Sequence, residues 1–303
     1  DPETSPFNLK GWHVAFFAAG IPGILMALWV ATVKEPVRGI SEGLVMPEHP
    51  APFREAWKEL KALIPLLNLI EIYRNGPGVT AVITNLLALV GICSLVYLLI
   101  LGTGDLAQWV ALGFGVYVAF SWAQNLKYSD RAVYHMMFGC RTFVLAVCGF
   151  PFLSFIAYGL SFWGPPYAQR AFGVSASEAG TVMGFCIALG GWAGVTLGGF
   201  LGDKFRDRSA LGRYYVVFIS LALCLPTGLG FTLADDKTIA YIAFFFFSAV
   251  SPMWLGCAIS TVNDLVMPRM RAIASAFYIL MLTFIGLALG PYSIGLVSDT
   301  LMS

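Results

Sequence analysis

The stretch GGWAGVTLGGFLGDKFRDR, residues 190–208, joins a glycine-rich apolar segment to a dense cluster of charges. Its glycines recur four residues apart: Gly190, Gly194, Gly198 and Gly202. Residues at this spacing share nearly one face of a helix, and glycine there lets a neighbouring backbone approach closely within lipid. Five charges follow within six residues: Asp203, Lys204, Arg206, Asp207 and Arg208. The stretch therefore predicts a membrane-spanning helix with a close-packing face and a charged end.

The composition of the 303-residue chain is that of a membrane protein. Hydrophobic residues make up 58% of it and charged residues only 12%, with a mean hydropathy of +0.77, whereas soluble domains are about a quarter charged. Six cysteines are scattered through apolar segments without a CxxC pair, which favours small buried side chains over disulfides or metal ligands. We expect no metal and no cofactor. Because the chain begins with Asp1 and not Met, we expect it to be part of a longer protein.

Eight apolar runs are long enough to cross a hydrocarbon core of ~30 Å. They are 11–33, 79–101, 105–122, 142–163, 180–201, 214–233, 238–262 and 271–297. Between the first two, residues 53–70 carry apolar side chains at helical spacing, with Arg54, Lys58 and Lys61 off that stripe. This pattern predicts an amphipathic helix in the membrane interface, which Pro65 should kink or break.

The distribution of basic residues supports this topology. The loops 34–78, 123–141, 202–213 and 263–271 hold 15 of the 18 Lys and Arg residues. Cytoplasmic loops carry such an excess of positive charge. The pattern therefore predicts a multi-pass protein of a plasma or bacterial inner membrane, with the N-terminus of this chain on the non-cytoplasmic side.

Catalytic patterns are missing from the sequence. His13, His49 and His135 fall at span edges or in loops, and no HExxH, GxSxG or Walker pattern occurs. We expect no catalytic residue, no enzyme activity and no nucleic-acid partner. All 17 acidic residues map to loops or span ends, although ion-coupled transporters normally hold a titratable group inside the bundle. Either the protein is a uniporter, or its coupling group lies outside this chain.

Two acidic residues have structural explanations in the sequence. Ser175 and Glu178 fit a capping box that opens the span at 180–201. Asp264 follows the span at 238–262 and is interpreted as a residue of a cytoplasmic loop.

The charged end of the opening stretch resembles a known motif. GFLGDKFRDR, residues 199–208, is similar to the loop motif of the major facilitator superfamily, G-x-L-A-D-R-x-G-R-[RK]. The matching positions are Gly199, Leu201, Asp203 and Arg208, with Lys204 in place of an arginine. Arg206 and Asp207 depart from the motif, as is usual for the copy between spans eight and nine.

Other segments extend the resemblance to nearly the whole chain. GWHVAFFAAGIPGILMALWVATVKEPVRG (11–39) resembles the sixth span and the start of the central loop. YGLSFWGPPYAQRAFGVSASEAG (158–180) and MPRMRAIASAFYIL (267–280) with TFIGLALGPYSIGLVSD (283–299) resemble the Spinster-like branch.

The resemblance implies an all-α fold in which this chain holds spans six to eleven. It divides the chain into the last span of the N-terminal half (1–33), a linker with an interfacial helix (34–78), an inserted two-helix hairpin (79–122) and the C-terminal half (142–303). The remaining spans, including most of the N-terminal half, are expected outside this chain as its partner.

The mechanism that the resemblance implies is alternating access, in which two helical halves rock about a central site. In that scheme the gating residues are Gly199, Asp203, Lys204 and Arg208, with Asp203 near a helix N-terminus of the opposite half. The packing or hinge positions are Gly190, Gly194, Gly198, Gly286, Gly290 and Pro291. The sequence leaves open whether the glycine face serves static packing or a sliding contact.

Candidate substrate contacts come from the spans that border the cavity in this fold. They are Ser154, Tyr158, Trp163, Ser251, Trp254, Asn263, Tyr278 and Thr283. For each of them, helix packing or lipid contact is an alternative interpretation. Such aromatic and hydroxyl groups suit a molecule with a long apolar part and a small polar head.

The functional hypothesis is a secondary active transporter in the lipid bilayer that moves a lysolipid-like amphipathic molecule, coupled to a proton as symporter or antiporter. The alternatives are a sugar-phosphate or organic-acid carrier of the same superfamily, and a non-transporting polytopic receptor or scaffold.

Overall fold

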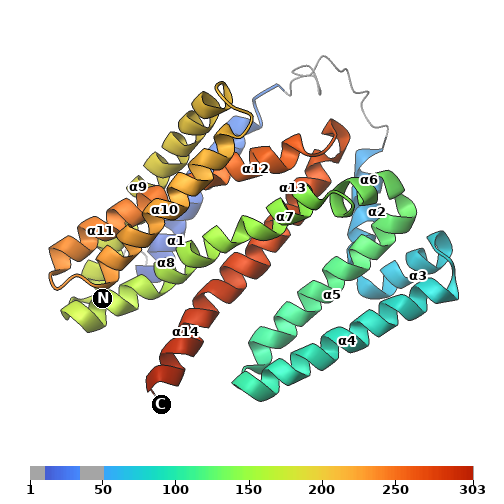
Figure 1. Ribbon diagram of the computed structural model, residues 1–303, viewed down its shortest axis with the longest axis horizontal. Helices are drawn as coiled ribbons and strands as arrows, with labels where there is room; N and C mark the ends of the chain where they lie inside the picture. The colour runs from blue at the N-terminus through green and yellow to red at the C-terminus, as the bar shows by residue number, and fades with distance from the viewer. Residues whose placement is uncertain (1–10, 35–50, 303) are drawn as a thin grey trace. The chain divides into compact units, whose positions relative to one another are not determined.

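The computed structural model describes residues 11–34 and 51–302, and these residues form helices with no strand among them (Figure 1). In chain order the helices are α1 Gly11–Val30, α2 Pro52–Leu63, α3 Pro65–Asn75, α4 Val79–Thr103, α5 Leu106–Ser129, α6 Arg131–Phe138, α7 Arg141–Gly149, α8 Pro151–Phe172, α9 Ala176–Arg206, α10 Gly212–Thr232, α11 Lys237–Val250, α12 Trp254–Asp264, the 3₁₀-helix η3 Pro268–Met270, α13 Arg271–Met281, the π-helix η4 Leu282–Ala288 and α14 Leu289–Met302. The predicted all-α fold is confirmed.

Seven helical segments are long and apolar enough to cross a membrane. They are Val79–Thr103, Leu106–Ser129, Arg141–Phe172, Ala176–Arg206, Gly212–Thr232, Lys237–Asp264 and Pro268–Leu301. Each contains one of the predicted spans from residue 79 onward, apart from one or two end residues. The apolar run predicted at 105–122 is shorter than the helix that contains it. Helix α5 continues beyond residue 122 through a polar turn to Ser129. The first predicted span, 11–33, coincides with α1, whose apolar stretch Phe16–Val30 is shorter than the other seven.

The chain divides into two units, the first containing α1 and the second α2 to α14. Helix α1 is apolar around its whole circumference and contains Pro22. A helix without a polar face suits an apolar environment on every side.

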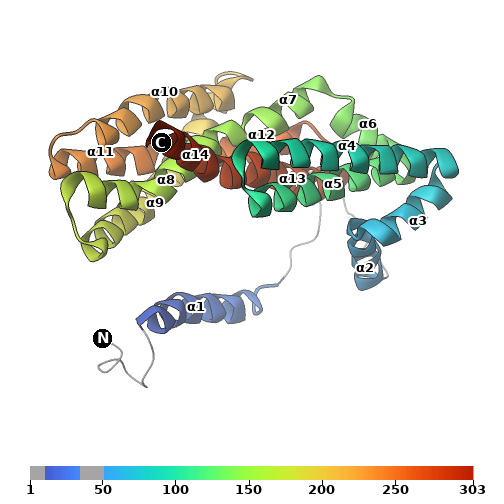
Figure 2. The ribbon, with the colours of Figure 1, turned by 90° about the horizontal axis from the view of Figure 1, so that it is seen from below.

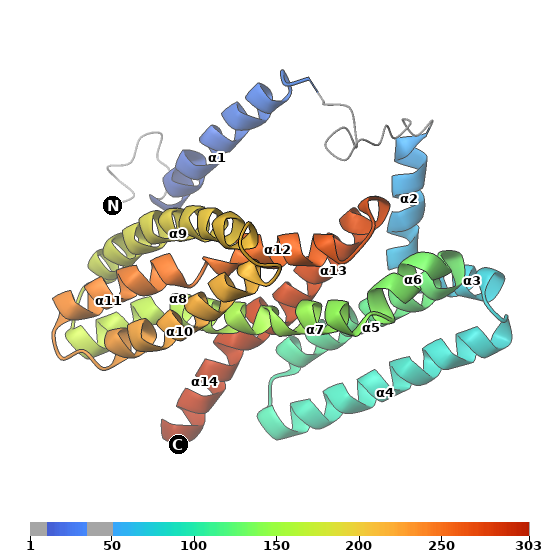
Figure 3. The same cartoon turned by 45° about the horizontal axis from the view of Figure 1, so that its top comes forward.

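The amphipathic segment in the second unit is broken at the predicted proline. Helix α2 ends at Leu63, and α3 begins at Pro65, where the missing N–H costs no helical hydrogen bond. The predicted apolar stripe is exposed along both helices, at Phe53, Trp57, Leu60, Ile64, Leu67 and Ile70. Helix α2 projects from the N-terminal end of α3 (Figures 2 and 3). The interfacial location of the stripe stays a prediction.

The opposite face of α3 packs on the inserted hairpin, with Asn68 and Ile72 fully buried. Helices α4 and α5 lie side by side and antiparallel, and α3 contacts both of them (Figures 1 and 3). The hairpin is thus part of a three-helix bundle, α3–α4–α5, and the predicted boundary at residue 79 does not separate α3 from it.

A network of uncharged polar side chains joins these three helices. Asn85 donates to Ser121 Oγ at 3.2 Å and to Gln124 Oε1 at 2.7 Å, and its own Oδ1 accepts from the Tyr117 hydroxyl at 2.8 Å. Asn68 donates to Ser121 Oγ at 2.7 Å. All five side chains are buried. In a low-dielectric interior such bonds fix the register of the helices, because a shift would break them and leave further polar groups unpaired beside Asn68 Oδ1.

The bundle is attached to the last span through α5. The Gln108 side chain donates to the carbonyl of Ala288 at 2.9 Å, and the Tyr292 hydroxyl donates to Asp105 Oδ2 at 2.7 Å. Both partners, Ala288 and Tyr292, lie where the π-helix η4 passes into α14. The inserted hairpin therefore contacts the span in which proline and glycine were predicted to permit bending.

The N-terminus of α9 is capped as predicted. Ser175 Oγ accepts a hydrogen bond from the backbone N–H of Glu178 at 3.1 Å. The Glu178 carboxylate pairs with Lys237 Nζ at 3.0 Å, which ties the start of α9 to the start of α11. Glu178 therefore has a structural partner at this end of the bundle.

Candidate functional site

The glycine face of α9 packs directly on the backbone of the span α11–α12, beside which α9 runs (Figure 3). All four ladder glycines are buried: Gly190, Gly194, Gly198 and Gly202. A β-carbon at Gly194 would overlap the carbonyl oxygen of Ala249, and one at Gly198 would overlap that of Met253. The glycine hydrogens therefore face these carbonyls, an arrangement that adds weak Cα–H···O attraction. These glycines thus lie in close contact with the neighbouring span.

The contact falls where the span α11–α12 is interrupted. Helix α11 ends at Val250 and α12 begins at Trp254, because Pro252 cannot donate an intrahelical hydrogen bond. The Ser220 hydroxyl of α10 donates to the Val250 carbonyl at 2.9 Å. A broken helix with satisfied carbonyls is the usual way in which a span accommodates bending. The structure shows close packing, and sliding along this face stays a prediction.

The charged motif at the end of α9 points away from this packing. A β-carbon at Gly199 would meet no atom within 4 Å. The side chains of Asp203 and Arg208 are exposed and make no hydrogen bond or ion pair to any residue that the structure describes. Lys204 Nζ lies 5.8 Å from the ring centre of Phe200, within cation–π range. The gating role of these four residues stays a prediction.

An ion cluster beside the motif was missed in the sequence. Asp264 Oδ2 accepts from Arg206 at 2.6 Å and from Arg213 at 2.5 Å. The cluster joins the end of α9, the start of α10 and the end of α12. Asp264 is therefore more than a loop residue, and Arg206, the departure from the motif, is one of its two partners. Exposed pairs of this kind add little stability, but they determine how these helix ends are arranged.

The last span approaches α8 through its two predicted glycines. A β-carbon at Gly286 would overlap Ser154 Oγ, and one at Gly290 would lie 2.6 Å from a backbone oxygen of α8. Trp163 Nε1 donates to the Pro291 carbonyl at 2.7 Å. Gly286 lies within the π-helix η4, and such helices are frequent at functional sites.

The structure does not bring the predicted substrate contacts together on one open surface. Four of them are buried among helices: Ser154, Ser251, Trp254 and Tyr278. Trp163 and Asn263 are half-buried, and Asn263 Oδ1 accepts from the Ser275 hydroxyl at 2.8 Å. Tyr158 and Thr283 are exposed. Substrate contact by any of the eight stays a prediction.

An apolar cavity of about 530 Å³ lies between α8, α10, α11 and α14, and sequence reasoning missed it. Its walls include Phe155, Leu160, Leu225, Phe247 and Ile294. Its lining contains no charged side chain. It suits a hydrocarbon group better than a charged one.

Comparisons with known proteins agree with this architecture. Residues 7–291 match the Major Facilitator Superfamily. An MFS-type efflux pump of Mycolicibacterium smegmatis is 26% identical over 53% of this chain and 37% of that protein. Protein spinster of Drosophila melanogaster is 27% identical over 54% of this chain and 28% of that protein. This chain thus covers roughly a third of the length of these relatives.

A solved structure is also similar. It is a crystal structure of a bacterial homolog to the human lysosomal transporter Spinster, in an inward-facing and occupied conformation. Its sequence is 26% identical, and the superposition has a TM-score of 0.43, covering 59% of this chain and 40% of that one. Because the superfamily match extends over nearly the whole sequence, the chain belongs to the Major Facilitator Superfamily, with Spinster proteins among its relatives.

Proposed function

We propose that this chain is part of a secondary active transporter that works by alternating access and moves a lysolipid-like amphipathic molecule, with coupling to a proton. The proposal rests mainly on residues 199–208 and on how the span that they end packs against its neighbour. A superfamily loop motif ends a span whose glycine face packs on an interrupted span, α11–α12. Close glycine contacts and an interrupted helix suit a bundle that changes its packing.

The apolar cavity supports the substrate class. Its volume of about 530 Å³ and its uncharged lining suit an acyl chain, while the head group of the substrate would require polar groups elsewhere. No carboxylate is buried among residues 60–302, which include the seven membrane-spanning segments. We therefore place the proton-coupling group outside this chain, and the N-terminus of this chain on the non-cytoplasmic side.

Transport by the intact protein in proteoliposomes is the direct test. We expect a radiolabelled lysolipid to accumulate when a pH gradient is imposed, and accumulation to fall when the gradient is collapsed. Uptake of a sugar phosphate or an organic acid in place of lysolipid would favour the other carrier class. If none of these solutes moves faster than through protein-free liposomes, the transport proposal fails and the scaffold alternative gains support.

The gating assignment predicts a specific effect of Asp203→Asn. We expect the initial rate of lysolipid uptake to fall on the order of tenfold, because lost coupling between two states is typically of this size. Thermal stability should not change, since the Asp203 side chain has no partner among the described residues. Asp207→Asn, which removes an equally exposed charge four residues further along, is the matched control. Equal rates for the two variants would refute the role of Asp203.

A further inference from the structure

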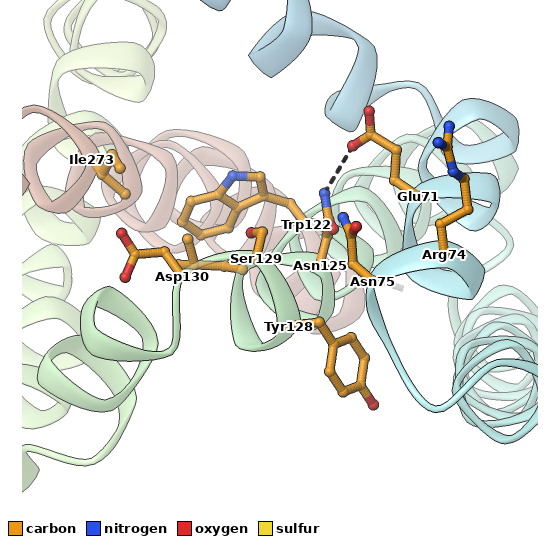
Figure 4. Close-up of a pocket in the computed structure, with 10 residues that line it drawn as sticks. Glu71, Arg74, Asn75, Trp122, Asn125, Tyr128, Ser129, Asp130 and Ile273 are labelled. Atoms are coloured by element: carbon orange, nitrogen blue, oxygen red, sulfur yellow. Dashed lines mark hydrogen bonds between the residues drawn. The ribbon is translucent and has the colours of Figure 1, made fainter.

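A polar cavity of about 720 Å³ lies in the second unit where α3, the end of α5 and the start of α13 meet (Figure 4). It is separate from the apolar cavity, with which it shares no lining residue. Its lining includes Glu71, Arg74, Asn75, Trp122, Asn125, Ser129 and Asp130. Charges of both signs and several amide and hydroxyl groups thus line one space.

Asn125 lines this cavity and is hydrogen-bonded to Glu71. Its side chain is 6% exposed, and its Nδ2 donates to Glu71 Oε2 at 3.2 Å. Its Oδ1 is buried and has no hydrogen-bond partner among the described residues. Buried carbonyl oxygens without a donor are rare, because they lose hydration without compensation. Glu71 Oε1 accepts no hydrogen bond from a described residue, so a donor that also carries positive charge suits this carboxylate.

Arg74 supplies the opposite charge one turn further along α3. Its side chain is exposed and makes no ion pair with Glu71 or with any other residue that the structure describes. Both side chains extend from α3 in Figure 4, where a dashed line joins Glu71 to Asn125. A guanidinium group offers paired N–H donors that match carboxylate and phosphate oxygens. The cavity therefore has an anion-binding end and a cation-binding end.

The remaining lining groups limit the ligand further. Asp130 caps α6, because its Oδ1 accepts from Val133 N–H at 3.1 Å, and its carboxylate adds a second negative charge to the lining. Trp122 stacks on Phe277 with ring centres 5.8 Å apart, which holds the indole in place as an apolar wall. Glu71 and Arg74, about one turn apart on α3, are the oppositely charged groups that would recognise a ligand.

We propose that this cavity binds a small zwitterion that carries an N–H-bearing ammonium group and an anion. The ammonium group donates to the Glu71 carboxylate, and the anion pairs with Arg74. A primary ammonium has three donors, whereas a quaternary ammonium has none and cannot donate to Glu71. The zwitterion comes either from solution or from the head group of a lipid, and the chemistry of recognition is the same for both.

The first arm of the test uses free zwitterions. Binding of O-phosphoethanolamine and of phosphocholine to the intact protein in a maltoside detergent is measured by titration calorimetry. We expect phosphoethanolamine to bind about tenfold more tightly or better, the usual effect of a charge-assisted hydrogen bond. Arg74→Gln and Glu71→Gln should each weaken its binding about tenfold. Lys127→Gln, which removes an exposed charge on α5 outside the cavity, should have no effect.

The second arm identifies a lipid source. Mixed vesicles of phosphatidylethanolamine and phosphatidylcholine are solubilised with the protein, and retained lipid is identified by native mass spectrometry. Enrichment of phosphatidylethanolamine that is lost in Arg74→Gln, without binding of the free zwitterion, assigns the site to a lipid head group. If Glu71→Gln fails to fold, Arg74→Gln still tests the site, because Arg74 is exposed. The comparison of phosphoethanolamine with phosphocholine also remains a test.

Three results would overturn the proposal: equal binding of both head groups, binding that Arg74→Gln leaves unchanged, or no binding in either arm. None of these measurements involves transport. The site can therefore fail while the proposed transport function stands, and the reverse also holds.

Discussion

Gly194→Ala is expected to lower the midpoint of thermal unfolding by about 5 °C or more. The added β-carbon overlaps the carbonyl oxygen of Ala249, which belongs to the backbone and cannot turn aside as a side chain would. Helix α9 must then move away from the span α11–α12, and overpacking of this kind costs ~1–3 kcal/mol, or several degrees in a protein of this size. The measurement is fluorescence-detected thermal unfolding of the intact protein in detergent.

Gly191→Ala is the matched control for this prediction. Gly191 lies three residues earlier on the same helix, and a β-carbon there meets no atom within 4 Å. Alanine is favoured over glycine inside a helix by ~1 kcal/mol, so the variant should unfold at the same temperature or slightly above. If the two alanine variants unfold together, the observed contact of α9 with α11–α12 is wrong.

Asn85→Leu should destabilise the three-helix bundle α3–α4–α5 by about 3 kcal/mol or more. The substitution removes three hydrogen bonds at once and leaves Gln124 Oε1 and the Tyr117 hydroxyl unpaired. Buried hydrogen bonds between membrane helices are worth ~0.6 kcal/mol each on average. An unpaired buried group adds ~1–3 kcal/mol to the cost of the substitution. The effect is measurable as faster proteolysis of the α3–α4 turn, at Gly76–Gly78, and as a lower unfolding temperature.

Thr84→Val provides the corresponding control. Thr84 is the exposed neighbour of Asn85 in α4, and its hydroxyl bonds only to the Thr80 carbonyl of its own helix, at 2.9 Å. We expect this variant to resist protease like the unchanged protein. A leucine at Asn85 that leaves proteolysis unchanged would mean that the polar network does not hold the bundle together.

Much of the fold could be predicted because lipid imposes simple rules on sequence. Apolar length locates the spans, Pro65 marks a helix start, and Ser175 marks a cap; the structure agrees with each. The three-helix bundle escaped prediction for a physical reason. Asn68, Asn85 and Ser121 lie on separate segments, and their pairing depends on how those segments pack.

The candidate site divides in the same way. The glycine ladder could be predicted because a four-residue period on one helix indicates a packed face by itself. The cluster of Arg206, Arg213 and Asp264 could not, because Asp264 lies more than 50 residues from either arginine. The distribution of basic residues predicts that both arginines lie on the cytoplasmic side, but it does not identify Asp264 as their partner. The spacing of apolar residues along a helix also cannot distinguish a side chain buried in the core, such as Trp254, from one that lines a cavity.

One residue at the end of the glycine ladder has a practical consequence. Cys257 lies on α12 against Gly198 and Gly202, with its Sγ 3.6 Å from the Gly198 carbonyl and its side chain 3% exposed. A thiol so enclosed is shielded from alkylation, and any separation of α9 from α12 would uncover it. The protein therefore contains a native chemical reporter of this interface, and the rate of maleimide labelling at Cys257 would follow its opening without an introduced cysteine.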